Sequence, residues 1–465
     1  MSLLDWPRGP LVRALACGRI LRVPIGNHLL FSISSPVWLC LLAIPVPAQT
    51  AHKPAPPAAS PSAFTLVSVK VTGSQRYRAE AVVAAGGLQT GESVTENDFK
   101  LASARLAETG AFTSVNYSYQ YSAQGAKLEL EVVDSDHFVP ARFENVVWFS
   151  DQELMDKLRS RVPLFLGQLP LEGKLADQVS DALQTLLVEN NVPGRADYLR
   201  AGDNDRVDAI VYSVSGETIR IRKTEFTGAG SDEMPLLEAA GAKLEGQDYL
   251  RSLLRMQEDK NFVPIYGARG YLKATFSDAS AKVVEQSPQE TDVDVAFSVD
   301  AGPRYQVAQI QVAGSKVLSA DKLRELIHQK LGQPANAVQL TSDTDAMKKL
   351  YGTLGYMAAA IQVMPTLDDD HATVSYQIRV EDGDLYHMGD LEIQGLDAHE
   401  TARVTARWTL AKNDSYDSSY PQRFVKDVLK TVLVDGEWNI SIHEMPEAAD
   451  KTVDVNVKFE RKATL

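Results

Sequence analysis

Glycine and asparagine landmarks recur about every 80 residues, and this internal period constrains the fold more than any single motif. Short runs rich in β-forming residues open the units, and four of these runs end on glycine, at Gly73, Gly228, Gly314 and Gly395. A second set of landmarks follows at Gly91, Gly167, Gly246, Gly332 and Asn413. A third set follows at Gly110, Asn191, Gly270, Gly355 and Gly436. The sequence is therefore a tandem array of five similar units.

Apolar residues between the landmarks switch from helical spacing to strict alternation. Ser319 is a predicted N-cap, and the helical stripe after it contains Leu323, Ile327 and Leu331, followed by a second stripe of Met347, Leu350 and Leu354. Glycine and asparagine tolerate the left-handed conformation, so the second landmarks are predicted to lie at helix C′ positions. Each unit ends in alternation typical of a strand buried on one face, as in Val293, Val295, Phe297 and Val299.

The sequence predicts an α+β protein of five tandem β-α-α-β-β repeats, each a three-stranded sheet covered by two helices. A short turn joins the last two strands of each repeat into an antiparallel hairpin. The second repeat is inferred mostly from its position in the series, because it has Phe143-Glu144-Asn145 where the other repeats have the opening glycine. The predicted repeats span residues 64–135, 138–216, 218–302, 303–383 and 384–461.

The first 48 residues have the pattern of an export signal, in which four arginines precede an apolar stretch and a small-residue cleavage point. An uncleaved anchor and a lipid attached to Cys40 are the alternatives. Residues 49–63 form a linker rich in proline and alanine. Because Cys17 and Cys40 both lie in the signal segment, the mature chain is expected to contain no disulfide and no cysteine ligand.

The order of elements, the period and the pairs Gly270-Tyr271 and Gly355-Tyr356 resemble the polypeptide-transport-associated repeat, known as POTRA. Five such repeats behind a signal are similar to the periplasmic region of the outer-membrane β-barrel assembly factor. This resemblance implies a place in the periplasm, associated with the outer membrane. It also implies outer-membrane β-barrel proteins or assembly-complex subunits as partners. The family normally continues into a membrane barrel, whereas six residues follow Phe459, so a barrel of its own is not expected here.

Composition and motifs argue against other classes of function. A formal net charge of −14 disfavours binding to nucleic acid or to anionic lipid. His371 follows three aspartates, but a hairpin turn accounts for that cluster better than a metal site does. The run Gly228-Ala229-Gly230-Ser231 lacks the lysine of a phosphate-binding loop. We therefore expect no enzyme activity, no catalytic or metal site and no cofactor.

The resemblance also implies that the strand after the second helix of each repeat is an open sheet edge, to which an extended polypeptide can add as a further strand. The predicted function is that of a non-enzymatic periplasmic polypeptide-binding scaffold in outer-membrane protein assembly. The alternative is a structural adapter in secretion or envelope organisation with one fixed partner, and the edges could equally be core or be covered by neighbouring repeats. The predicted edge residues are Phe112, Val115, Tyr271, Leu272, Ala274, Phe276, Met357, Ala359, Ile361, Trp438 and Ile440.

Overall fold

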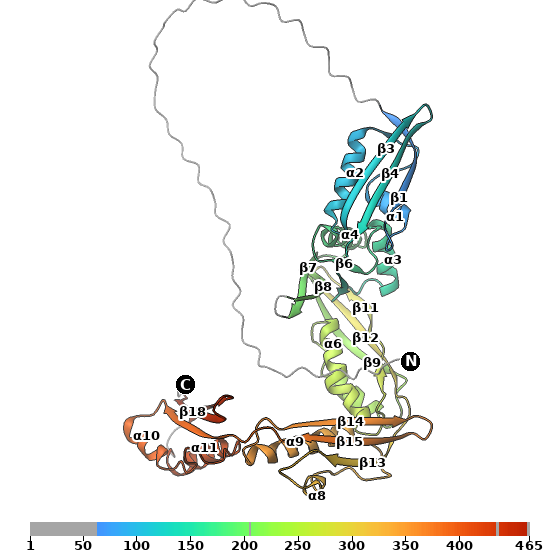
Figure 1. The fold of residues 1–465 in the computed structure, drawn as a ribbon. Helices are drawn as coiled ribbons and strands as arrows, with labels where there is room; N and C mark the ends of the chain where they lie inside the picture. The colour runs from blue at the N-terminus through green and yellow to red at the C-terminus, as the bar shows by residue number, and fades with distance from the viewer. Residues whose placement is uncertain (1–62, 204–205, 434–436, 463–465) are drawn as a thin grey trace, which may run out of the picture. The chain divides into compact units, whose positions relative to one another are not determined.

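The computed structural model describes residues 63–203, 206–433 and 437–462. Within these ranges the chain forms five small sheets, each with its own helices, and we call each sheet with its helices a unit (Figure 1). The predicted signal segment, nearly all of the predicted linker and the landmark Gly436 lie outside the described residues. The units cover residues 64–134, 138–215, 218–300, 306–381 and 387–461.

Units 1 and 2 each contain a sheet of four strands, with the orders β2-β1-β4-β3 and β6-β5-β8-β7. In unit 1, α2 runs alongside β3 (Figure 1). The elements of unit 1 are β1 Phe64–Thr72, α1 Ala79–Ala85, β2 Ser93–Val94, α2 Glu96–Glu108, β3 Phe112–Ser122 and β4 Gly125–Asp134. Those of unit 2 are β5 Phe138–Phe143, α3 Asp151–Arg161, β6 Gln168–Pro170, α4 Leu175–Glu189, β7 Arg195–Asp203 and β8 Arg206–Ser215.

In unit 3 the second helix is irregular and the edge strand is interrupted. A π-helical turn, η1, lies between two short α-helices, and the strand that follows is split into β10 and β11, which both pair with β12. The elements are β9 Thr218–Thr227, α5 Met234–Gly241, α6 Arg251–Gln257, η1 Glu258–Phe262, α7 Val263–Gly267, β10 Thr275–Phe276, β11 Ser280–Gln286 and β12 Glu290–Asp300.

Units 4 and 5 have three-stranded sheets, with the orders β13-β15-β14 and β16-β18-β17. Unit 4 consists of β13 Gln306–Ala313, α8 Ala320–Arg324, α9 Ala337–Thr353, β14 Ala360–Asp368 and β15 Thr373–Glu381. Unit 5 consists of β16 His387–Gln394, α10 Ala398–Thr405, α11 Tyr420–Thr431, β17 Trp438–Glu447 and β18 Thr452–Arg461.

One strand topology is common to all five sheets. The last strand of each unit lies in the centre, parallel to the first strand and antiparallel to the strand that precedes it. The predicted α+β class and the antiparallel pairing of the last two strands are therefore confirmed. Among the described residues, the predicted three-stranded sheet is found in units 4 and 5 only: the short strands β2 and β6 add a fourth strand in units 1 and 2, and the divided edge strand adds one in unit 3. In units 3 to 5 a single bridge, such as Gln306↔Pro334, occupies the place of β2 and β6.

The opening glycines are required because the first strand comes very close to the central strand. Gly314 has φ +102°, and a Cβ there would lie 2.3 Å from the carbonyl oxygen of Val380. The other opening glycines face the central strand in the same way. In unit 2 the side chain of Asn145 replaces this contact, because its Nδ2 donates to the Val214 carbonyl (2.9 Å) and its Oδ1 accepts from the Val214 N–H (2.8 Å). Unit 2 thus keeps the geometry without the glycine.

The second landmarks adopt the predicted left-handed conformation but do not end helices. Gly332 has φ +72°, yet α8 already ends at Arg324. The N–H of Gly332 donates to the Val307 carbonyl of β13 (2.8 Å), and Asn413 donates to Met388 of β16 at the same distance. These residues mark the turn that returns the chain to the first strand. The helix C′ assignment was therefore wrong.

The first helix of unit 4 is shorter than its apolar spacing predicts. Ser319 is the N-cap, as expected, and its hydroxyl accepts from the Lys322 N–H. After Arg324 the chain leaves the helix, and the buried carboxylate of Asp343 accepts hydrogen bonds from the His328 N–H (2.8 Å) and Nδ1 (2.7 Å). Leu331 is 63% exposed and does not continue the stripe.

Candidate polypeptide-binding edges

The strand after the second helix lies at the edge of its sheet in every unit. β3, β7, β14 and β17 each pair on one side only among the described residues, as do β10 and β11 together. An edge strand directs half of its N–H and C=O groups away from the sheet, where another extended segment can pair with them. These edges are the candidate sites, and the predicted residues are placed against them below.

In unit 1 both predicted residues lie in β3, on the face covered by the helices. Phe112 is buried in the core and packs edge-on against Tyr77. Val115 is half-buried, and its carbonyl accepts a hydrogen bond from Ser103 Oγ of α2 (3.3 Å). The start of this edge is therefore covered by the helix.

In unit 3 three of the four predicted residues precede the strand. Tyr271, Leu272 and Ala274 lie in a turn in which the Ala274 N–H donates to the Tyr271 carbonyl (3.3 Å). Leu272 packs against the hydrophobic cluster of unit 4, whereas Tyr271 and Phe276 pack against that of unit 3. Phe276 alone lies in an edge strand, the two-residue β10.

In unit 4 the strand also starts later than predicted. Met357 and Ala359 lie in a turn closed by the Ala359 N–H, which donates to the Tyr356 carbonyl (3.2 Å). Ile361 lies in β14 and pairs with Val380. The turn that follows each Gly-Tyr pair displaces the strand by three or four residues, and alternation of apolar residues does not reveal such a turn.

In unit 5 both predicted residues lie in the edge strand β17. Trp438 pairs with Arg461, whose guanidinium carbon lies 5.0 Å from the centre of the indole ring. Ile440 pairs with Phe459 and packs against the core. Both side chains are half-buried, so they support the sheet as well as line its edge.

Unit 2 contributed no predicted residue, and its edge is partly occupied by its own helix. Gln184 of α4 accepts from the Ala196 N–H through Oε1 (2.8 Å) and donates from Nε2 to the Gly194 carbonyl (3.3 Å). Ser180 Oγ donates to the Ala196 carbonyl (3.2 Å). The backbone groups that an added strand would need at Ala196 are therefore already bonded. We call these hydrogen bonds from Gln184 and Ser180 to the backbone of β7 the clasp at Ala196. They depend on tertiary structure, and no sequence pattern reveals them.

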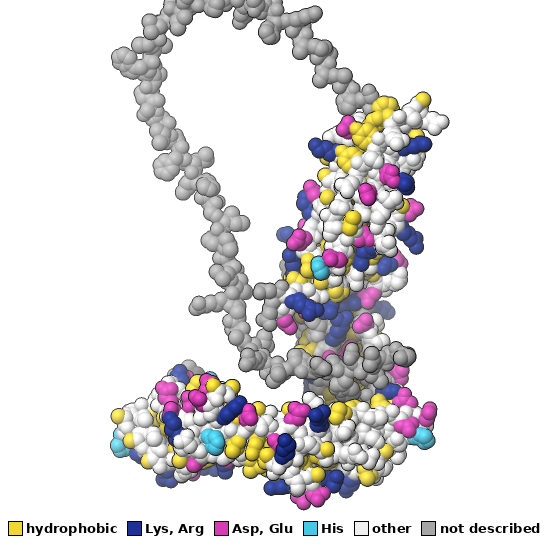
Figure 2. Space-filling view, in the orientation of Figure 1, with side chains coloured by type: hydrophobic (Ala, Val, Ile, Leu, Met, Phe, Trp, Pro, Cys, Tyr) yellow, Lys and Arg dark blue, Asp and Glu magenta, His cyan; other side chains and the backbone are white. Residues whose placement is uncertain are grey.

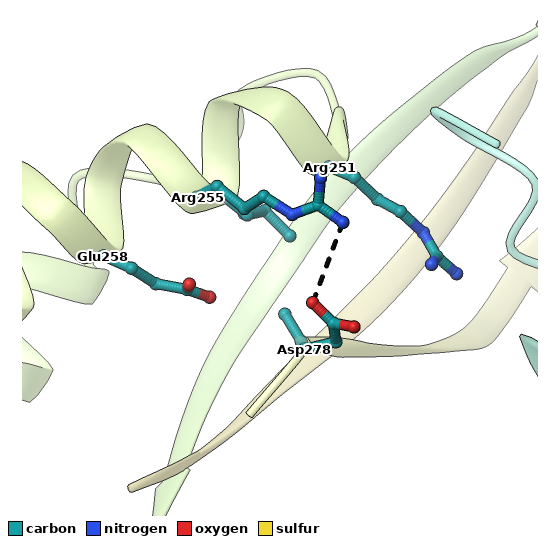
Figure 3. A pocket seen from close by; sticks show the side chains of 6 residues that line it. Arg251, Arg255, Glu258 and Asp278 are labelled. Carbon is teal, nitrogen blue, oxygen red and sulfur yellow. Dashed lines mark ion pairs between the residues drawn. The ribbon is translucent and has the colours of Figure 1, made fainter. Parts of the chain in front are cut away.

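A shallow hollow lies beside the interrupted edge of unit 3 (Figure 3). Arg255 and Asp278 form an ion pair of 3.7 Å across it, and the carboxylate of Glu258 points into the same hollow (Figure 3). Burial, together with the nearby carboxylates of Asp259 and Asp278, raises the pKa of Glu258 to about 7. The residues lining the hollow are Arg251, Leu254, Arg255, Glu258, Asp278 and Ala279.

Two further searches cover the described residues only. In residues 63–203, 206–433 and 437–462, no three His, Cys, Asp or Glu side chains are grouped as metal ligands. Over the same ranges, none of the helices has the length and apolar character needed to cross a membrane.

Comparison with known proteins identifies the repeat. The sequence model of the POTRA family, described as a surface antigen variable number repeat, matches residues 305–383, which contain unit 4. The resemblance inferred from the order of elements, the period and the Gly-Tyr pairs is confirmed, because residues 305–383 match the POTRA family model. Over most of its length it resembles the outer membrane protein assembly factor BamA of Neisseria meningitidis serogroup B, with 20% identity over 415 residues. That match covers 86% of this chain and 50% of BamA, so the chain spans half the length of this relative.

Solved structures of the same family are also similar to the chain. The POTRA3–5 fragment of Haemophilus influenzae BamA matches with a TM-score of 0.42 and 16% identity, covering 53% of this chain and 98% of the fragment. POTRA1–3 of the periplasmic domain of Omp85 from Anabaena matches with a TM-score of 0.22 and 17% identity, covering 53% of this chain and 95% of that one.

Proposed function

We propose that the chain is a non-enzymatic, polypeptide-binding scaffold of the periplasm that serves outer-membrane protein assembly. Two observations support this: the relative over most of the chain is an outer membrane protein assembly factor, and a related fragment belongs to a periplasmic domain. The observation that carries the proposal is the repeated topology, which puts the strand after the second helix at an edge in all five sheets. Each unit is proposed to be one POTRA repeat.

Binding would proceed by addition of an extended client strand to a sheet edge. Backbone pairing requires no particular client sequence, and each hydrogen bond contributes a net ~0.5–1.5 kcal/mol. A few such bonds, set against the entropy lost on association, give weak and reversible complexes. Such affinity suits a factor that must pass unfolded clients on. The proposed partners are outer-membrane β-barrel proteins or assembly-complex subunits.

A hydrogen-exchange experiment tests this function. The whole chain is mixed with an extended peptide from an outer-membrane β-barrel protein, and amide protection is followed by mass spectrometry. We expect protection to increase in one or more of residues 112–122, 195–203, 275–286, 360–368 and 438–447. Unchanged protection in all five segments at peptide concentrations up to the millimolar range would contradict edge binding.

A second candidate function is a structural adapter with one fixed partner. The clasp at Ala196 favours it, because a fixed partner needs no open edge. Affinity capture from cells distinguishes the two, since an adapter co-purifies with one protein at constant stoichiometry whereas a scaffold yields many substoichiometric clients.

A further inference from the structure

The five edges are not equally able to accept a strand. β14 contains Pro365 and β17 contains Pro446, at positions paired with the buried residues Tyr376 and Val453. Proline is tolerated in an edge strand where its nitrogen faces away from the neighbouring strand. Each proline therefore removes an N–H that an incoming strand would need, a common protection against unwanted edge pairing.

The edges of units 2 and 3 are obstructed in other ways. In unit 2 the side chains of α4 occupy both backbone groups of Ala196. In unit 3 the edge is broken between β10 and β11, and the register of β11 shifts again between Val283 and Glu285. A continuous incoming strand cannot follow either edge along its whole length.

In β3 of unit 1 the Ser103 hydroxyl of α2 occupies the Val115 carbonyl, as Ser180 occupies that of Ala196 in unit 2, but none of these obstructions is found among the described residues from Asn116 to Ser122. Its register with β4 is regular over that length, and it contains no proline. Tyr117, Tyr119 and Tyr121 pair with Leu130, Leu128 and Ala126, which are all buried. The tyrosines thus occupy the face positions that carry proline in β14 and β17.

This placement fixes the direction of the tyrosine backbone groups. In an antiparallel pair, residues of one parity direct both N–H and C=O toward the neighbouring strand, and those of the other parity direct both away. Ala196 of β7, which pairs with buried Val214, bonds outward to the helix with both groups. By the same parity, the three tyrosines of β3 direct their N–H and C=O groups outward from the sheet.

The tyrosine side chains form a continuous aromatic ladder at this edge. Ring centres lie 6.4 Å apart for Tyr117 and Tyr119 and 5.0 Å apart for Tyr119 and Tyr121. Phe64 of β1 stacks on Tyr121 at 4.2 Å, and Tyr121 is 38% exposed. Figure 2 shows hydrophobic side chains gathered over this end of unit 1. The ladder therefore extends the apolar surface of the unit to its open edge.

The outer end of the ladder is acidic. The carboxylate of Glu96, at the start of α2, faces the Tyr119 hydroxyl and raises the pKa of that phenol. Asp98 accepts hydrogen bonds from the Thr95 N–H (2.7 Å) and hydroxyl (2.8 Å), which lower its pKa and keep it ionised. Two carboxylates beside an aromatic edge complement a cationic side chain.

We infer that β3 is the principal receiving edge of the chain. Its ligand is an extended polypeptide segment with aromatic side chains at alternate positions and a lysine or arginine next to Glu96. This inference rests on the proposed function and names the chemistry of its client. Alternate residues of an added strand project onto the face of the ladder, at the 4.5–5.5 Å spacing of cross-strand pairs. Each tyrosine then adds an aromatic contact that strengthens binding roughly three- to tenfold.

The test uses the whole chain and two synthetic 11-residue peptides labelled with a fluorophore. The first carries aromatic residues at alternate positions and a terminal lysine, and the second has the same composition with its aromatic residues adjacent. Anisotropy gives the affinities, and hydrogen exchange gives the location. We expect the first peptide to bind at least tenfold more tightly and to protect residues 112–122.

Point variants distinguish a loss of peptide contacts at the tyrosine ladder from a general loss of stability. Tyr121→Ala, at the exposed end of the ladder, should weaken the first peptide roughly three- to tenfold, whereas Tyr198→Ala on β7 is the matched control and should leave it unchanged. Glu96→Lys should weaken the lysine peptide and strengthen one that ends in glutamate. Misfolding cannot produce that reversal, so this variant keeps the inference testable if an alanine variant is unstable.

Other outcomes overturn the inference in distinguishable ways. Protection of residues 360–368 or 438–447 with β3 unchanged would refute the assignment to unit 1 and leave the proposed function standing. Absence of protection at every edge would refute both. Equal binding of the two peptides would refute the aromatic specificity. Concentration-dependent protection of β3 without peptide would show that a second copy of the chain occupies it.

Discussion

At the scale of single residues, the fold depends on close contacts that only certain side chains permit. The opening glycines lie against the carbonyl oxygens of the central strands, and Asn145 reproduces that contact with its amide. The landmarks were predictable from the sequence because left-handed backbone selects glycine and asparagine. What they contact was not predictable, since the partner carbonyl lies about 60 to 70 residues away.

Substitution of Gly314 tests the close contact. Gly314→Ala places a Cβ against the Val380 carbonyl at positive φ, so we expect unit 4 to lose about 2–4 kcal/mol of stability. Gly332→Ala is the control, because it has positive φ but no atom within 4 Å of the new Cβ, and its expected cost is about 1 kcal/mol. Hydrogen exchange of residues 305–383 measures both, and equal losses would contradict the contact.

The raised pKa of Glu258 leads us to expect that the local stability of unit 3 depends on pH. Its pKa is raised in the folded state from 4.5 to about 7, so the folded state favours the protonated carboxyl. The resulting stabilisation is complete below pH 4.5 and is lost as the pH rises through 7. Because the side chain is partly exposed, we expect a loss of about 1 kcal/mol. Protection factors in residues 251–267, which are corrected for the intrinsic pH dependence of amide exchange, should fall over this range in the parent and stay constant in Glu258→Gln.

At the scale of elements, the edge strands differ through features of two kinds. Pro365, Pro446 and the tyrosine alternation of β3 can be seen in the sequence, but their meaning depends on which strand lies at the edge and which face is covered. The clasp of Gln184 and the turns before β14 depend on tertiary contacts. The sequence therefore predicts the approximate positions of four edge strands. How accessible each edge is to an added strand can be judged only from the structure.

Removal of a blocking proline should open a second edge. Pro365→Val restores an outward N–H in β14 and leaves its pairing with β15 unchanged, so the aromatic peptide should now also protect residues 360–368. Met364→Val is the matched control, because Met364 has the opposite parity and already carries an N–H. No gain of protection in Pro365→Val would show that proline does not limit this edge.

At the scale of the whole molecule, the distribution of hydrophobic clusters determines how far a local defect spreads. Unit 4 has a cluster of its own, whereas the cores of units 1 and 2 belong to one continuous cluster. In tandem arrays, stability is the sum of unit terms and nearest-neighbour terms, so a shared cluster should couple two units more strongly than a contact between separate clusters, such as that of Leu272 with unit 4. Cooperativity along this chain is therefore expected to be uneven.

Two substitutions of fully buried aliphatic residues by alanine test whether a local defect spreads to a neighbouring unit. Ile378→Ala removes a fully buried side chain of β15, and Leu183→Ala removes one of α4; each should cost about 2–5 kcal/mol locally. We expect Ile378→Ala to accelerate exchange in residues 305–383 and to leave β3 and β4 protected. Leu183→Ala should accelerate exchange in both units 1 and 2, because they share its cluster. Faster exchange confined to unit 2 would show that the shared cluster does not couple them, and the edge strand β3 of unit 1 would then fold independently of its neighbour.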